Sequence, residues 1–228
     1  MVFCDFPLGE YWAIPYQEIN SPEMNSPRLS AAILAGGKSR RMGQSKALLE
    51  IDGIPVIDRV AQVLRQITSE LLIIVSLDAS PVELNISGAK IITDQAPNRG
   101  PLMAIFTALQ ATSAQHCLVL ACDLPLITVP ILAEMIRVID TYDAVVPITD
   151  NGYEPLCAIY TQSCLPVIKS RIERNQLSVR QLFTDLRIYA FSEWREVDPT
   201  GNAFLNMNTP TDYEIAKKLL TRQSEVVA

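Results

Sequence analysis

Short apolar runs alternate with segments of helical periodicity along most of this chain. The apolar runs have the length and residue types of buried strands, and residues 56–67 repeat apolar side chains at the spacing of a helix. Strands are predicted at Ala31–Ala35, Leu71–Ser76, Ala89–Thr93, Cys117–Ala121 and Ala144–Pro147, and helices at Val56–Ile67, Leu102–Ala111 and Val129–Ile139. This order predicts an α/β fold of three layers, with a mostly parallel central sheet covered on both faces.

The last third of the chain departs from this alternation. A strand is predicted at Glu154–Tyr160, a polar helix near 162–174, a short helix near 178–184 and a strand at Arg187–Ala190. Thr209, Pro210 and Asp212 form a start signal for a final helix. Thr128 is the predicted N-cap of the helix that begins at Val129.

Composition limits the domain organisation and the partners. Residues 1–28 show no periodic pattern, so we expect a loosely held, flexible N-terminal extension. Residues 29–228 are expected to form a single domain, since the apolar content of 49% supports one sizeable core. A net charge of −6 disfavours extended nucleic-acid binding, and no apolar run reaches the length of a membrane span.

The five cysteines and the single histidine exclude some chemistry. An odd number of cysteines without a C-x-x-C pair favours free thiols in a reducing compartment, and hence a cytoplasmic protein, over a zinc site or a disulfide framework. His116 precedes a predicted strand and has no evident catalytic partner, which disfavours histidine-dependent hydrolysis.

The segment from Leu34 to Lys46 joins a predicted strand to a loop suited to a polyphosphate. It contains two adjacent glycines, then three basic residues, then a glycine and a lysine. Backbone N–H groups can approach phosphate oxygens where no Cβ interferes, and cationic side chains neutralise charge. The first glycine of a Walker A motif is missing, because Ala32 stands there, and no G-x-G-x-x-G occurs. The alternative is a glycine-rich surface loop with solvated charges.

Two carboxylates follow predicted strands, where ligands of open α/β sheets bind. Asp123 is the candidate for Mg²⁺, since one or two carboxylate oxygens with phosphates and waters suit this ion. Its alternative role is to cap the turn before Leu124 and Pro125. Asp94 is a candidate acceptor for a base or ribose, or a simple turn residue. Gly100 lets a loop pass close to a ligand at the start of a helix, or merely forms the junction.

These residues together resemble the molybdenum cofactor guanylyltransferases of the nucleotidyltransferase superfamily. The family pattern L-A-G-G-x-S-x-R-M-G-x-x-K-A-L-L is met by Leu34–Leu49. Further matches in family order are Ile92-Thr93-Asp94, Gly100-Pro101-Leu102, Cys122-Asp123-Leu124-Pro125, Pro155–Tyr160 and Asn206-Met207-Asn208-Thr209-Pro210. The resemblance implies a Rossmann-like nucleotidyltransferase fold and the transfer of GMP from GTP to molybdopterin, with release of pyrophosphate.

The resemblance also implies roles for individual residues. Lys46 would bind phosphate and stabilise the charge at the reacting phosphorus, assisted by Arg41, and Asp123 would bind nucleotide and Mg²⁺. The other residues implied to contact GTP are Leu34, Ala35, Gly36, Gly37, Asp94 and Gly100. Asn206 and Asn208 would line the pterin side or complete the metal shell. Cofactor-insertion proteins or recipient molybdoenzymes are the implied protein partners.

The chain departs from the family at several points. Ser76 stands where some members have an asparagine that touches the nucleotide, residues 174–176 lack an expected glycine, and the N-terminal extension is unusual. The nearest alternative is a cytidylyltransferase for the same cofactor, whose loop reads L-A-A-G where this chain has Gly36. Other small-molecule nucleotidyltransferases and a non-catalytic nucleotide-binding protein are further alternatives.

Overall fold

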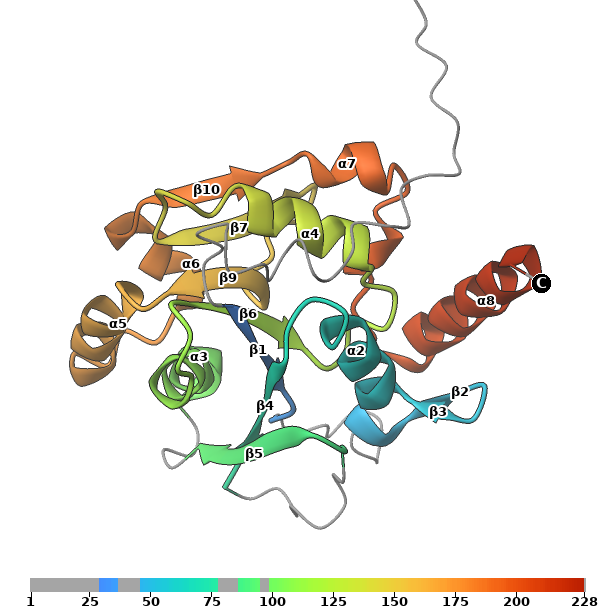
Figure 1. The fold of residues 1–228 in the computed structure, drawn as a ribbon, viewed down its shortest axis with the longest axis horizontal. Helices are drawn as coiled ribbons and strands as arrows, with labels where there is room; N and C mark the ends of the chain where they lie inside the picture. Colours follow the sequence, from blue (N-terminus) through green and yellow to red (C-terminus); the bar gives the residue numbers. More distant parts are fainter. Residues whose placement is uncertain (1–28, 37–45, 78–85, 95–98, 228) are drawn as a thin grey trace, which may run out of the picture.

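The computed structural model describes residues 29–36, 46–77, 86–94 and 99–227. Within these residues, eight strands form one sheet with helices on both faces (Figure 1). The strands of this sheet are β1 (Leu29–Leu34), β4 (Glu70–Ser76), β5 (Ala89–Asp94), β6 (His116–Ala121), β7 (Ala144–Thr149), β8 (Gly152–Tyr153), β9 (Cys157–Thr161) and β10 (Ile188–Phe191). Their order is β10-β7-β9-β6-β1-β4-β5, and β8 pairs with β7. The predicted three-layer α/β fold is confirmed.

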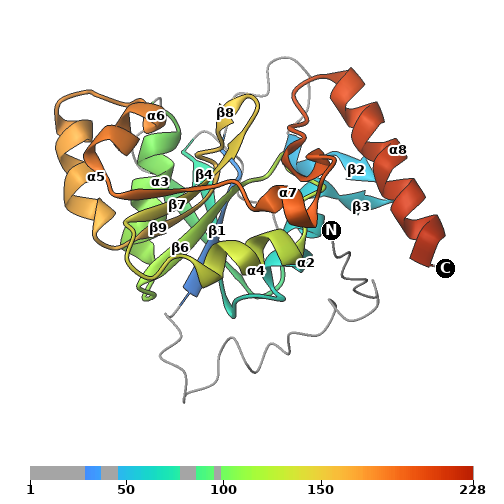
Figure 2. The same ribbon diagram turned by 90° about the horizontal axis from the view of Figure 1, so that it is seen from above.

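Helices and a small hairpin complete the described fold (Figure 2). The α-helices are α2 (Val56–Leu64), α3 (Gly100–Ala111), α4 (Val129–Arg137), α5 (Cys164–Glu173), α6 (Val179–Leu182), α7 (Trp194–Val197) and α8 (Pro210–Val227). The 3₁₀ turns are η1 (Lys46–Leu48), η3 (Phe183–Asp185) and η4 (Asn202–Phe204), and β2 (Glu50–Ile51) pairs with β3 (Ile54–Pro55) in the hairpin. No described helix is long and apolar enough to cross a membrane.

The central strands read as unbroken apolar runs because both of their faces are buried. Along β1, Ala31 and Ile33 pack into a core cluster with residues of α2 and α4. The intervening Ala32 and Leu34 pack into a second cluster with residues of α3 and α5. Successive side chains of a strand point to opposite faces, so one strand contributes to both layers. These two cores fix where β1 ends and the glycine loop begins.

β9 runs antiparallel between β6 and β7, unlike the neighbouring parallel pairs. Leu120 near the end of β6 pairs with Cys157 at the start of β9. The residues that precede β9 therefore lie at the same sheet edge as the residues that follow β6. This reversal brings a segment of the last third of the chain to the edge where ligands of α/β sheets bind.

One local prediction is wrong, and a second is confirmed only in part. The strand expected from Glu154 begins at Cys157, because the Cys157 N–H donates to the Glu154 carbonyl at 3.0 Å and closes a turn there. Thr128 is the N-cap of α4, as predicted, and has the extended backbone of that position, but its side chain makes no capping hydrogen bond. Pro130, the second residue of α4, has no N–H to offer that side chain. The expected N-terminal extension, residues 1–28, lies outside the described residues.

The single histidine is a structural residue at the opposite end of β6 from Asp123. His116 is 4% exposed, and its Nδ1 has no hydrogen-bond partner among the residues that the structure describes. Burial lowers the pKa of His116, and the nearby Asp140 carboxylate opposes that shift only in part. Protonation of His116 is therefore less favourable in the folded protein than in the unfolded chain.

This burial predicts a loss of stability at mildly acidic pH. Because the folded pKa lies below the ordinary value of about 6.5, the stabilisation is complete above that pH and is lost as pH falls from it. Thermal unfolding from pH 8 to pH 5 should show a falling Tm in the native protein and a smaller fall in His116→Gln. Parallel curves for the two proteins would contradict the assignment.

Candidate active site

The end of β1 is held between two strands by backbone hydrogen bonds. The Ala35 N–H donates to the Ile74 carbonyl of β4 at 2.9 Å, and the Cys122 N–H donates to the Leu34 carbonyl at 3.3 Å. Leu34 and Ala35 thus use these two groups within the sheet. These bonds fix the position from which the chain leaves the sheet toward Gly36.

Gly36 lies against the end of β4. A Cβ at Gly36 would stand 3.2 Å from the Ser76 backbone nitrogen and 3.5 Å from the Ser76 Cβ. Such a distance to backbone is tighter than side chains normally adopt, so only glycine fits without a shift of β4. Ser76 in turn pairs with Asp94 at the end of β5. Gly36, Ser76 and Asp94 therefore gather at one side of the sheet edge.

Asp123 follows β6 at the same edge and is tied to the segment before α8. The Met207 N–H donates to the Asp123 carbonyl at 3.0 Å. This contact places Asn206 and Asn208, the two neighbours of Met207, beside the turn that carries Asp123.

The start of α8 is fixed by a reciprocal cap. The Asp212 N–H donates to the Thr209 Oγ1 at 3.2 Å, and the Asp212 carboxylate accepts from the N–H groups of Thr209 and Asn208. This capping pattern satisfies backbone donors at the helix start and holds the approach of the chain rigidly. The predicted helix start is thus confirmed.

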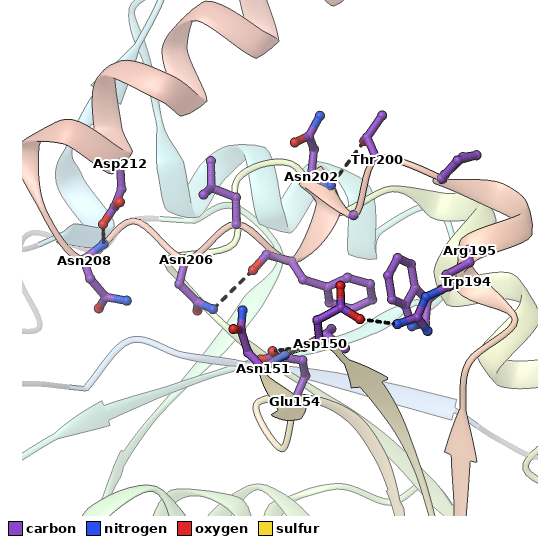
Figure 3. Close-up of a pocket in the computed structure, with 15 residues that line it drawn as sticks. Asp150, Asn151, Glu154, Trp194, Arg195, Thr200, Asn202, Asn206, Asn208 and Asp212 are labelled. Carbon is purple, nitrogen blue, oxygen red and sulfur yellow. Dashed lines mark hydrogen bonds and ion pairs between the residues drawn. The ribbon is translucent and has the colours of Figure 1, made fainter.

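A pocket of about 550 Å³ opens beside this segment (Figure 3). One wall is formed by Thr149–Asn151 and Glu154, at the β7–β8 turn and the residue before Pro155. The opposite wall comes from α7, from Pro199–Asn202 and from the chain between Phe204 and Asn208. The pocket and the Gly36–Ser76–Asp94 group thus flank Asp123 on its two sides, along the strand order from β5 to β7.

Comparison with known proteins identifies the family. Residues 31–188 match the model of the MobA-like NTP transferase domain. A protein of Pelotomaculum thermopropionicum named "Probable molybdenum cofactor guanylyltransferase" is 35% identical over 80% of this chain and 89% of its own. A molybdenum cofactor guanylyltransferase of Desulfosudis oleivorans is 32% identical over 83% of this chain and 94% of its own. The chain belongs to the molybdenum cofactor guanylyltransferase family.

A solved structure supports the fold of this nucleotidyltransferase. The molybdopterin-guanine dinucleotide biosynthesis protein A of Archaeoglobus fulgidus superposes with a TM-score of 0.74. It is 23% identical and the match covers 85% of this chain and 99% of that one. The Rossmann-like nucleotidyltransferase fold that the sequence resemblance implied is therefore confirmed.

Glu154 is a site residue of this nucleotidyltransferase that the sequence patterns did not single out. The Glu154 N–H donates to the Pro147 carbonyl of β7 at 2.9 Å, and the turn from Glu154 to Cys157 leads into β9, where Cys157 pairs with Leu120 of β6. A search for carboxylates after parallel strands misses it, because Glu154 precedes an antiparallel strand. The signal that would have found it is the Glu-Pro pair directly before the Pro155–Tyr160 motif.

The electrostatic surroundings of Glu154 disfavour its charge. Burial raises the pKa of Glu154, and the Asp123 carboxylate raises it further. A hydrogen bond from the Thr149 Oγ1 at 3.1 Å and the Arg180 guanidinium lower the pKa, without cancelling the shift. Carboxylates held in such unfavourable surroundings are typical of functional sites in this kind of pocket.

The roles of four predicted site residues cannot be compared with contacts in the described structure. Gly37 and Arg41 lie outside the described residues. The backbone of Lys46 begins η1, and its side chain lies outside the described part. Gly100 is the first residue of α3 and has a φ of 68°, a conformation that favours glycine. The roles assigned to these four residues stay predictions.

The unfavourable charge on Glu154 predicts a stabilising substitution. With a raised folded pKa, ionisation destabilises the protein as pH rises above about 4.5, and the effect is absent below that pH. Glu154→Gln should therefore raise the Tm by about 1–3 °C at pH 7.5 and by less at pH 4.5, measured by calorimetry. A lower Tm for the variant at pH 7.5 would contradict this account.

Proposed function

We propose that this nucleotidyltransferase transfers GMP from GTP to molybdopterin, forming the guanine dinucleotide form of the cofactor and releasing pyrophosphate. The observation that carries the proposal is the position of Asp123. It lies between the Gly36–Ser76–Asp94 group, suited to the nucleoside, and a separate polar pocket, suited to a second substrate. The names of the curated relatives supply the identity of the two substrates.

In the proposed reaction, a terminal phosphate oxygen of molybdopterin attacks the α-phosphorus of GTP. The bond from that phosphorus to the oxygen bridging to the β-phosphorus breaks, and pyrophosphate leaves with the electron pair. The nucleophile is already ionised, so no histidine base is required. The protein's contribution is then to position both substrates and to stabilise charge at the transferred phosphoryl group.

The residues around Asp123 fit a divalent metal, which we propose to be Mg²⁺. No group of three His, Cys, Asp or Glu side chains that could hold a metal is found among the described residues. Mg²⁺ nevertheless binds through one or two carboxylates together with substrate phosphates and waters. Asp123, at the turn after β6, supplies one such carboxylate. When bound, the ion would neutralise charge on the phosphates.

Further roles in this mechanism fall to the glycine loop and its flanks. We propose that Lys46 and Arg41 bind the phosphates and stabilise charge at the reacting phosphorus. Leu34, Ala35, Gly36 and Gly37 would position the nucleotide, and Asp94 and Gly100 would lie beside the nucleoside. Asn206 and Asn208 would line the pterin side.

Gly36 is the residue at which this chain differs from the L-A-A-G loop of the cytidylyltransferases. The alanine of an L-A-A-G loop would place its Cβ 3.2 Å from the Ser76 nitrogen, so that loop would need a different end of β4. The cytidylyltransferase remains the alternative function.

The domain organisation, the location and the protein partners are also proposals. We propose that residues 29–228 act as one nucleotidyltransferase domain, with residues 1–28 as an extension. Cys117, Cys157 and Cys164 are free thiols, which supports a cytoplasmic location. Recipient molybdoenzymes or cofactor-insertion proteins are the proposed partners of the product.

A nucleotide panel tests the function. Purified protein with molybdopterin and Mg²⁺ should release pyrophosphate from GTP and yield a product with the mass of the guanine dinucleotide. We expect kcat/KM for GTP to exceed that for CTP by about 10²-fold, because buried polar groups reject a base that leaves them unpaired. Equal kcat/KM values for GTP and CTP would contradict the preference for guanine. If no nucleotide yields a product, the proposal that the protein is an enzyme of this kind is refuted.

Replacing the carboxylate of Asp123 tests its proposed role. Asp123→Asn keeps the size of the side chain and should lower kcat by about 10²–10³-fold, with an unchanged circular dichroism spectrum. Asp140→Asn, at the other end of the sheet, is the matched control and should keep full turnover. Undiminished rates of Asp123→Asn at saturating Mg²⁺ would reject the role.

A further inference from the structure

Three carboxylates line the pocket, and among the described residues Glu154 is the one that neither caps a helix nor forms an ion pair. The Asp212 carboxylate caps α8. Asp150 pairs with Arg195 at 2.9 Å and its side chain is 96% exposed. Glu154 is half-buried, and its Oε1 accepts from Thr149, whereas its Oε2 has no hydrogen-bond partner among the described residues. Glu154 thus offers a fixed hydrogen-bond acceptor to whatever enters the pocket.

The remaining lining favours an uncharged group over an anion. Among the described residues that line the pocket, Arg195 is the only cationic one, and it is bound to Asp150 and stacked at 4.2 Å over the ring of Trp194. Trp194 and Phe204 pack edge to face in the wall, with ring centroids 5.0 Å apart. Carboxylates outnumber cations in this lining, so a phosphate would be repelled.

Amide side chains add further polar contacts around Glu154. Asn151 lies on the same wall as Glu154, and Asn206 lies on the segment that leads to α8 (Figure 3). The Asn206 Nδ2 donates to the Phe204 carbonyl at 3.3 Å, which turns its amide toward the pocket wall. Amides both donate and accept, so they suit the oxo group and ring nitrogens of a heterocycle.

We propose that Glu154 recognises the aminopyrimidinone edge of the pterin in the second substrate. That edge carries a ring N–H next to an exocyclic amino group, and the two donors match the two oxygens of a carboxylate. The proposal rests on the proposed function, because it assigns the pocket to the pterin end of the acceptor. Glu154 is then a specificity residue that binds substrate away from the reacting phosphorus.

Guanine presents the same pair of donors, so position must decide between the two heterocycles. Asp94 on β5 and Asp123 after β6 are separated by three strand spacings, or about 14 Å. A nucleotide with its base near Asp94 and its α-phosphate near Asp123 occupies that span. Glu154 lies on the far side of Asp123, at the start of the turn before β9. The acceptor substrate must approach from this side.

Steady-state kinetics test the assignment in the full-length enzyme. Glu154→Gln keeps the shape of the side chain but replaces one acceptor oxygen with a donor, so it should raise KM for molybdopterin by about 10–100-fold. KM for GTP and the Mg²⁺ concentration for half-maximal rate should stay unchanged. Glu134→Gln is the matched control, because Glu134 pairs with Arg137 on α4 and does not line the pocket.

Direct binding gives a readout that does not depend on turnover. Pterin and lumazine differ at the 2-position, where pterin carries an amino group and lumazine an oxo group. Fluorescence titration should show the native protein binding pterin at least 10-fold more tightly than lumazine. Glu154→Gln should lose that preference, and Glu134→Gln should keep it.

Each alternative role of Glu154 predicts a different result in these experiments. A raised KM for GTP in Glu154→Gln would assign the residue to guanine, and a raised Mg²⁺ requirement would make it a metal ligand. Unchanged kinetics, or no preference for pterin in the native protein, would also overturn the proposal. A native enzyme that discriminates pterin from lumazine but transfers no guanylyl group would refute the proposed function and leave the recognition by Glu154 standing.

Discussion

The backbone hydrogen bonds that hold the end of β1 between β4 and β6 are the constraint on which the candidate site depends. They fix Leu34 and Ala35 at the sheet edge, so Gly36 meets Ser76 on one side while Cys122 and Asp123 follow on the other. Both faces of β1 are buried in separate cores, so a slip by one residue would exchange the side chains between the two cores and disturb the packing of both. The positions of loops distant in sequence follow from this register.

The antiparallel direction of β9 brings further residues to the sheet edge at which Asp123 lies. A fully parallel sheet would bring only loops that follow strands to the ligand edge, whereas β9 brings Glu154, which precedes a strand. The contact between Met207 and Asp123 adds the segment before α8. Asp123 therefore lies between the close approach of Gly36 to Ser76 on one side and an open polar pocket that contains Glu154 on the other. Such an arrangement suits a reaction that joins two phosphorylated molecules.

The sequence predicted the fold better than it predicted the residues that line the pocket beside Asp123. The runs at β1, β4 and β6 are buried on both faces, so their apolar residues are unmistakable, and the positions of Asp94 and Asp123 followed from strand ends. Glu154 could not be found in this way, because the direction of β9 depends on tertiary pairing that local periodicity does not encode. The same applies to Trp194 and Arg195, which lie on a helix too short to show a period.

A crystal structure with a non-hydrolysable GTP analogue, Mg²⁺ and a pterin tests the central claim most directly. The account predicts the guanine beside Gly36, Ser76 and Asp94, the α-phosphate beside Asp123, and the pterin in the pocket with its amino group at Glu154. A guanine in the pocket at Glu154, or both ligands on the same side of Asp123, would contradict it.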